Sequence, residues 1–247
     1  MTVTQQSNAR FGPWAALAVF AAVWIAVDAL VEISCRFVLT RLQIDGVRER
    51  VAVEALSGIV LNWTMFAVCV LVLHRRGQTL RDIGWRRPAT RRSWVLAVVI
   101  ATLLAGSALA SFGKTAQLLT DWSSYRISLG VVLGGSAGLC LEMIFRGFVM
   151  TQARDAGLSV SLQITLSAVL FAVALNRMAW SGFPGHPEFW AVVGTTASST
   201  VLGVAFAIIY VIGNRSLNPA IAAHAAIDMV VEPGMILMAA MAGSTAG

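Results

Sequence analysis

Charged residues are scarce in this sequence of 247 residues. Asp, Glu, Lys and Arg make up only 12% of it, whereas 57% is hydrophobic, and the mean hydropathy is +0.77. A soluble domain carries about 25% charged residues. The shortage of charge therefore argues against a soluble enzyme and predicts a polytopic membrane protein.

Lysine and cysteine are also rare. Of the 18 basic residues 17 are Arg, and seven of these lie in the single segment His74–Arg92, so the net charge of +6 does not indicate a nucleic-acid partner. The three cysteines, Cys35, Cys69 and Cys140, lie in apolar segments without a CxxC spacing. This pattern indicates neither a disulfide framework nor a thiolate metal site, and we expect three small core residues.

Long polar segments, low-complexity regions and clear repeats are missing as well. We therefore expect one integral-membrane domain over residues 1–247, with an all-α fold: a bundle of about seven (seven or eight) transmembrane helices. Each needs about 20 apolar residues, and the fourth and the last runs are long enough to be broken. The expected spans are Pro13–Ile33, Val51–Leu73, Ser93–Phe112, Ile127–Met150, Leu158–Leu175, Phe189–Ile212 and Leu217–Met241.

The arginine-rich segment His74–Arg92 carries the strongest signal for orientation. It holds seven Arg and one Asp, and loops rich in Lys and Arg remain on the cytoplasmic side of a membrane. The segment is therefore predicted to be cytoplasmic, and an even number of preceding spans places the N-terminus on the same side.

Two charges interrupt the apolar stretch LEMIFRGFVM. Glu142 and Arg146 are four residues apart, so they are neighbours on a helix surface. An ionisable group at bilayer depth costs roughly 2.5–3.5 kcal/mol and usually faces the bundle interior. The preceding row of Gly130, Gly134 and Gly138 lies on the same face and predicts close packing against another helix. The pair is either an internal ion pair or part of a catalytic site.

Spacing four recurs in the first and the last predicted span. In the first, Glu32 and Arg36 can pair, which favours a structural role. In the last, the carboxylate of Asp228 follows His224 at i+4 and can orient its imidazole. Glu142 and Arg146 on one helix, and the His–Asp pair on another, predict one shared polar pocket.

These residues resemble the CPBP family (CAAX protease and bacteriocin-processing, or Abi) of intramembrane glutamic endopeptidases, whose motifs are EExxxR, FxxxH and HxxxN or HxxxD. The resemblance covers about residues 127–231 and includes the final SLNPAIAAHAAID. Glu142 and Arg146 fall on the second Glu and the Arg of the first motif. Phe171 falls on the Phe of the second, and His224 with Asp228 matches the third.

The resemblance fails at two positions. Leu141 stands where the family has its first Glu, and Leu175, followed by Asn176, stands where it has its second-motif His. The family implies that this Glu and His activate the attacking water, while the third motif stabilises the oxyanion. A leucine cannot accept a proton, so the first motif and the second motif are degenerate.

Three functions follow as alternatives. The first is a pseudoprotease in the bacterial plasma membrane, which binds a membrane-bound or prenylated peptide, or a partner protein, and contacts membrane lipid. The second is an active endopeptidase that uses Glu142, His224 and Asp228 as catalytic residues, with Arg146, Phe171 and Asn176 in support. The third is a small transporter. No HExxH pattern occurs, and we expect no metal or other cofactor.

Overall fold

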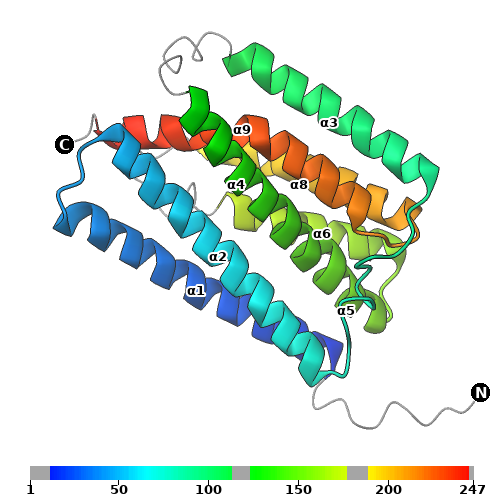
Figure 1. The fold of residues 1–247 in the computed structure, drawn as a ribbon. Helices are drawn as coiled ribbons and strands as arrows, with labels where there is room; N and C mark the ends of the chain where they lie inside the picture. The colour runs from blue at the N-terminus through cyan, green and yellow to red at the C-terminus, as the bar shows by residue number, and fades with distance from the viewer. Residues whose placement is uncertain (1–11, 113–122, 177–188, 245–247) are drawn as a thin grey trace, which may run out of the picture.

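In a computed structural model, residues 12–112, 123–176 and 189–244 are described, and within these ranges the chain is helical with no strand. With α4, η2 and α5 taken as one composite rod, the described residues form seven helical rods, whose arrangement is drawn in Figure 1. The elements are α1 (Pro13–Arg41), α2 (Val47–Arg75), α3 (Arg91–Phe112), α4 (Ser123–Glu142), the π-helix η2 (Met143–Val149), α5 (Met150–Asp155), α6 (Val160–Leu175), α8 (Phe189–Ile212) and α9 (Asn218–Ser244).

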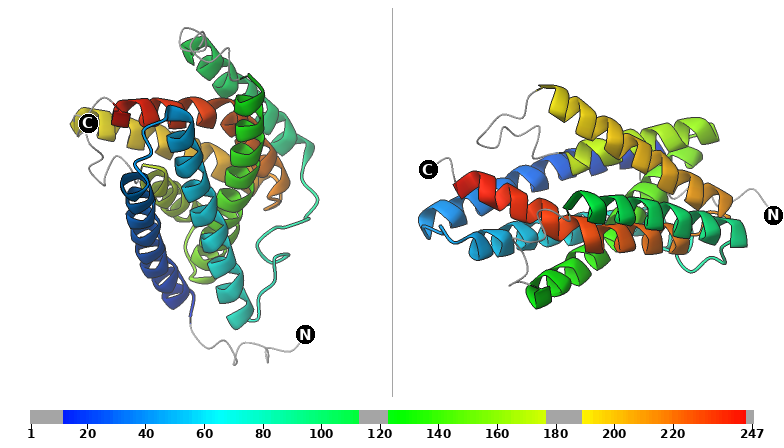
Figure 2. Two further views of the ribbon diagram at one scale, coloured as in Figure 1. Left: turned by 60° about the vertical axis from the view of Figure 1, so that its left-hand side comes forward. Right: turned by 90° about the horizontal axis from the view of Figure 1, so that it is seen from above.

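The composite rod is the central element. The predicted fourth span is continuous through α4, η2 and α5, and its break is a π-helix rather than a gap. It packs most extensively against α9 and also against α2, while α6 pairs with α8. α1 and α2 lie on one side of the bundle and α3 lies along α9 on the other (Figure 1, Figure 2).

Glycine explains the close contact between α4 and α9. A Cβ atom at Gly134 would lie 2.6 Å from the backbone nitrogen of Met229, and one at Gly138 would lie 2.6 Å from that of Ala225. Only glycine leaves room for the two backbones to approach this closely, which confirms the packing predicted for these two positions. The surroundings of Gly130 lie outside the described part.

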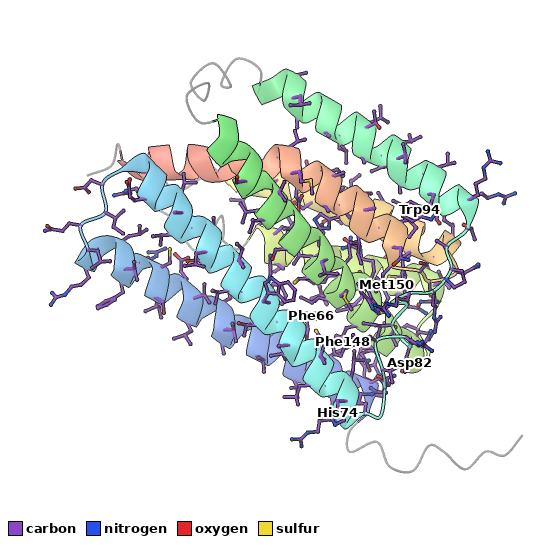
Figure 3. All side chains as sticks on the ribbon, in the orientation of Figure 1. Phe66, His74, Asp82, Trp94, Phe148 and Met150 are labelled. Carbon is purple, nitrogen blue, oxygen red and sulfur yellow. The ribbon has the colours of Figure 1, made fainter. Side chains whose placement is uncertain are left out.

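Burial separates the centre from the periphery. Of the apolar window in α4–η2–α5, 78% is buried, whereas the corresponding share of α3 is 11%. Phe148 and Met150 are fully buried within the bundle, while Trp94 on α3 is 42% exposed (Figure 3). The three cysteines are buried and free, as predicted.

The outer helices present apolar side chains, such as Ile25 and Phe37 on α1, to the surroundings. Among the described residues, five helices are long and apolar enough to cross a membrane, and α6 is a shorter apolar helix of 16 residues. An apolar surface of this kind suits lipid, since backbone polar groups are satisfied inside each helix. The chain is an integral membrane protein with the predicted helical bundle fold.

Candidate functional site

The π-helix η2 begins directly after Glu142 and contains Arg146. A π-helix is wider than an α-helix and occurs frequently at functional sites. Its backbone is supported from two sides: the hydroxyl of Ser167 on α6 donates a hydrogen bond to the carbonyl of Phe145 (3.1 Å), and Gly147 packs against Ile83. The wide turn is thus fixed by its neighbours.

Four ionisable side chains meet beside this turn. Arg146 Nη1 donates to Glu142 Oε1 at 2.9 Å, and His224 Nδ1 lies 2.7 Å from the same oxygen. His224 Nε2 lies 3.1 Å from Oδ2 of Asp228, one helical turn further along α9. The sequence prediction that these four residues share one pocket is correct. We call Glu142, Arg146, His224 and Asp228 the polar quartet.

The two ring nitrogens of His224 both face carboxylate oxygens. Both contacts are hydrogen bonds to ionised carboxylates only when each nitrogen carries a proton, which makes the ring an imidazolium. The polar quartet then contains two cations and two anions, so its net charge is zero. Such pairing is what permits ionised groups in a low-dielectric interior.

Aromatic rings enclose the polar quartet. Phe206 of α8 is stacked on His224, with 4.7 Å between ring centroids, and Phe171 of α6 meets the same ring edge-on at 5.5 Å. The guanidinium of Arg146 lies 4.3 Å from the centroid of Phe171 and donates to the carbonyl of Gly203 (2.9 Å). These contacts add cation–π attraction and hold the charged groups in place.

The polar quartet is closed to its surroundings. Glu142 and Arg146 are 0% exposed, His224 is 1% exposed and Asp228 is 7% exposed. Two of its polar atoms, Glu142 Oε2 and Arg146 Nε, have no hydrogen-bond partner among the described residues. The site therefore combines a dense ion-pair network with one carboxylate oxygen that retains free lone pairs.

The positions where the resemblance expects water-activating groups lie in different surroundings. Leu141 is 4% exposed and belongs to the hydrophobic core, whereas Leu175 is 37% exposed at the end of α6. Asn176 follows it and donates to Ser199 Oγ (3.0 Å) and to the carbonyl of Ala172 (2.8 Å). Asn176 thus ties α6 to α8, and neither of these two partners belongs to the polar quartet. The roles of all these residues remain predictions.

A groove of about 670 Å³ opens between α1 and α6. Phe145 forms part of its wall, and the same ring packs edge-on against Phe171 at 5.5 Å. These two rings therefore stand between the groove and His224. The lining includes Asp28, Glu32 and Arg36 of the first span besides apolar side chains, namely Phe20, Ala21, Trp24, Ile25, Ala29, Ile33, Phe145, Leu170, Val173 and Ala174.

Sequence reasoning missed this groove and the contributions of α8. Phe206 and Gly203 lie on an apolar helix with no charged residue near them, so no spacing indicated that they face the polar quartet. No group of three or more His, Cys, Asp or Glu side chains suited to a metal ion occurs in the described ranges.

Comparison with known proteins adds an independent observation. No curated protein and no solved structure matches the chain. Residues 121–230 match the family model described as type II CAAX prenyl endopeptidase Rce1-like. This range spans the composite rod, α6, α8 and the part of α9 that carries His224 and Asp228. The resemblance to the CAAX proteases is thereby confirmed: the part of the chain that carries the polar quartet is Rce1-like.

Proposed function

We propose that this CAAX-protease-like membrane protein binds a membrane-embedded or prenylated peptide and does not hydrolyse it. Hydrolysis needs a group that takes a proton from the attacking water. Where the resemblance would place a Glu and a His for this task, the sequence has Leu141 and Leu175. Neither side chain can exchange protons.

The observation that carries this proposal is the engagement of Glu142. Its Oε1 is shared by Arg146 Nη1 at 2.9 Å and His224 Nδ1 at 2.7 Å, and the residue is 0% exposed. Turning this carboxylate towards a substrate would leave Arg146 buried without its counterion. Such a change costs roughly 3–5 kcal/mol, which favours a structural role for the pair.

The groove between α1 and α6 supports binding. Its volume of about 670 Å³ lies in the range of 300–1,000 Å³ that is usual for ligand sites. Apolar side chains suit a hydrocarbon chain or an apolar helix, and Glu32 with Arg36 offers polar contacts at one part of the lining. Exposed neighbours such as Ile25 and Ile33 suit entry from the lipid.

One observation favours a second candidate, an active endopeptidase. Glu142 Oε2 is buried and has no hydrogen-bond partner among the described residues, so it has lone pairs that could accept a proton from water. In that reaction His224, oriented by Asp228, would stabilise the oxyanion. The substrate would have to displace Phe145 or Phe171 to reach this oxygen.

A prenylated CAAX peptide with a fluorescent label distinguishes the two. We expect saturable binding to the detergent-purified protein, and no cleaved peptide by mass spectrometry. Val173→Trp fills the groove and should weaken binding about tenfold or more, since a filled pocket loses several apolar contacts. Val169→Trp, one turn earlier on the same exposed face and outside the lining, is the matched control.

Cleavage that disappears in both Glu142→Gln and His224→Ala would overturn the proposal and establish the endopeptidase. Absence of saturable binding would remove the assigned ligand class. Equal loss in Val169→Trp and Val173→Trp would show that the peptide does not occupy the groove.

A further inference from the structure

A second polar region lies at the end of the bundle where α2, α5 and α8 terminate. The segment 76–90 crosses this end and is tied to it by hydrogen bonds. Gln78 donates to Asp155 Oδ2 (2.7 Å), Thr90 Oγ1 donates to the carbonyl of Ile212 (2.9 Å), and Ser216 Oγ donates to that of Arg87 (2.7 Å). Three helix ends that are distant in sequence are thus held together.

Close packing fixes the contact between the segment 76–90 and the turn that follows α8. Gly84 has φ of +102°, and a Cβ atom there would clash with the backbone carbonyl of Arg215. Leu217 N donates to the carbonyl of Gly84 at 3.3 Å. The segment 76–90 therefore needs glycine at this point, and it holds the backbone of Arg215 in a defined place.

The depth of this region follows from the candidate spans. Three of them end at Arg75, Asp155 and Ile212. Arg76, Arg154 and Arg215 lie within three residues of those ends. Because a spanning helix ends where the hydrocarbon gives way to the polar headgroups, all three guanidinium groups lie at the level of the lipid phosphates.

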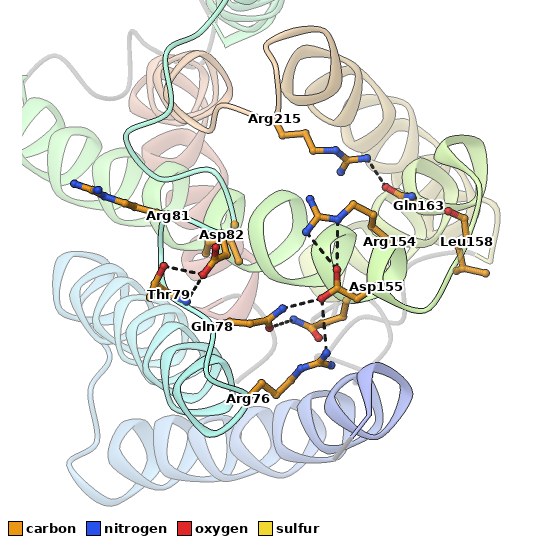
Figure 4. A network of polar contacts seen from close by, with 12 residues as sticks. Arg76, Gln78, Thr79, Arg81, Asp82, Arg154, Asp155, Leu158, Gln163 and Arg215 are labelled. Carbon is orange, nitrogen blue, oxygen red and sulfur yellow. Dashed lines mark hydrogen bonds and ion pairs between the residues drawn. The ribbon is translucent and has the colours of Figure 1, made fainter. Parts of the chain in front are cut away.

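Positive charge exceeds negative charge among these side chains. Arg76 and Arg154 both contact Asp155, at 3.7 and 3.3 Å, while Arg215 donates to the neutral amide oxygen of Gln163 at 2.8 Å. The single charge of Asp155 is thus shared by two guanidinium groups. In Figure 4, Arg154 lies between Arg76 and Arg215, and both Arg154 and Arg215 act electrostatically on the hydroxyl of Tyr210.

A second carboxylate, Asp82, lies in this region (Figure 4). Asp82 accepts hydrogen bonds from the backbone N–H and the hydroxyl of Thr79 (2.6 and 2.8 Å). The backbone hydrogen bond is the main reason that the pKa of Asp82 lies below its usual value, and the charges of Arg87 and Arg154 add to the effect. Asp82 adds one negative charge near Arg87 and Arg154, so guanidinium groups still outnumber carboxylates in this region.

Several donors in this region lack an acceptor. Arg76 Nε and Nη1, and Arg215 Nη1, are buried and have no hydrogen-bond partner within the described ranges. Burial lowers the pKa of Arg76, which reflects poor solvation of its charge. Buried guanidinium donors are normally paired, and a phosphate oxygen is a strong acceptor for two of them at once.

We propose that Arg76, Arg154 and Arg215 form a binding site for the phosphate of an anionic lipid headgroup. The guanidinium groups supply planar donor pairs and uncompensated positive charge at the depth of that phosphate. Basic pockets between membrane helices bind anionic headgroups in this way. The site is at the end of the bundle and does not depend on the groove or on the polar quartet.

Phosphatidylglycerol and phosphatidylcholine, added separately to the full chain in a neutral detergent, test this site. Bound lipid is counted by native mass spectrometry, and the melting temperature is followed in parallel. We expect saturable binding of phosphatidylglycerol about tenfold tighter than that of phosphatidylcholine, because one charge-assisted contact contributes about a factor of ten.

Variants locate the site. Arg76→Gln and Arg215→Gln should each weaken phosphatidylglycerol binding about tenfold. Arg91→Gln removes the same charge from an exposed residue at the start of α3 and should leave binding within about twofold of the unchanged chain. Arg215→Lys keeps the charge and guards against loss of folding; we expect an intermediate affinity.

Equal binding of the two lipids would overturn the proposal, as would an equal loss in Arg91→Gln. A site for free phosphate would be revealed by millimolar inorganic phosphate that raises the melting temperature and displaces phosphatidylglycerol. That result would remove the lipid assignment while retaining the three arginines as its ligands.

Discussion

Two Glu–Arg pairs in this protein share the same spacing and differ in almost everything else. In α1, Arg36 Nε contacts Glu32 Oε1 at 2.6 Å, and the two side chains are 48% and 16% exposed. In the central rod, Arg146 contacts Glu142 at 2.9 Å and both are 0% exposed. One pair lines an open groove, while the other is enclosed by α6, α8 and α9.

The comparison shows that an i, i+4 spacing predicts that a Glu and an Arg form an ion pair, but it does not predict how much that pair contributes to stability. The α1 pair lies near the end of its span, where the long Arg36 side chain can reach the polar interface, so its charges depend less on each other. A buried pair is indispensable once formed, because removal of one partner strands the other charge. Mutations at the two pairs, and at the contacts that enclose the second, should therefore have very different effects.

The largest effect is expected for Arg146→Ala. It leaves Glu142 buried with only His224 to balance it, removes the hydrogen bond to Gly203 and vacates the face of Phe171. The free energy of unfolding should fall by roughly 3–5 kcal/mol. Thermal unfolding in detergent and the yield of folded protein would measure this. A well-expressed variant with an unchanged melting temperature would contradict the pairing.

A smaller loss is expected when the wall around the buried pair is forced apart. In Gly138→Ala the new Cβ would lie 2.6 Å from the backbone nitrogen of Ala225, so α4 and α9 must separate. Overpacking of this kind costs about 1–3 kcal/mol. Gly135→Ala is the matched control, since nothing lies within 4 Å of its Cβ. Equal melting temperatures for the two variants would argue against tight α4–α9 packing.

Sequence reasoning predicted much of this region for identifiable reasons. The i, i+4 spacing of Glu142 with Arg146, and of His224 with Asp228, follows from helix geometry, and the glycine row predicted that α4 packs closely against another helix. The aromatic enclosure by Phe206 could not be predicted, because an apolar residue on an apolar helix gives no sign of its direction.

The π-helix, the exposure of Leu175 and the groove could not be predicted from the sequence either. Apolar length predicted all seven helices, but the π-helix depends on tertiary support from Ser167 and Ile83, which are distant in sequence. The exposure of Leu175 depends on where α6 ends, and the groove depends on how α1 packs against α6. Neither feature can be read from the sequence, because both depend on contacts between helices.

A third variant tests the support of the π-helix that holds Arg146. Ser167→Ala removes the hydrogen bond from α6 to the carbonyl of Phe145, which keeps only its backbone hydrogen bond from Met150. We expect a loss of about 0.5–1.5 kcal/mol in the free energy of unfolding. Ser198→Ala is the control, because that exposed hydroxyl donates only to Gly194 of its own helix. If both variants unfold alike, Ser167 gives η2 no special support.

The smallest effect should come from the exposed counterpart of the buried pair. Arg36→Ala removes a contact of 2.6 Å to Glu32, which is the shorter of the two ion pairs. The pair lies near the end of α1, where the half-exposed Arg36 can reach the polar interface, so we expect a contribution of about 0–1 kcal/mol. Thermal unfolding should therefore place Arg36→Ala close to the unchanged chain and far from Arg146→Ala. Similar losses in the two variants would mean that the difference in exposure does not separate the energies of these two pairs.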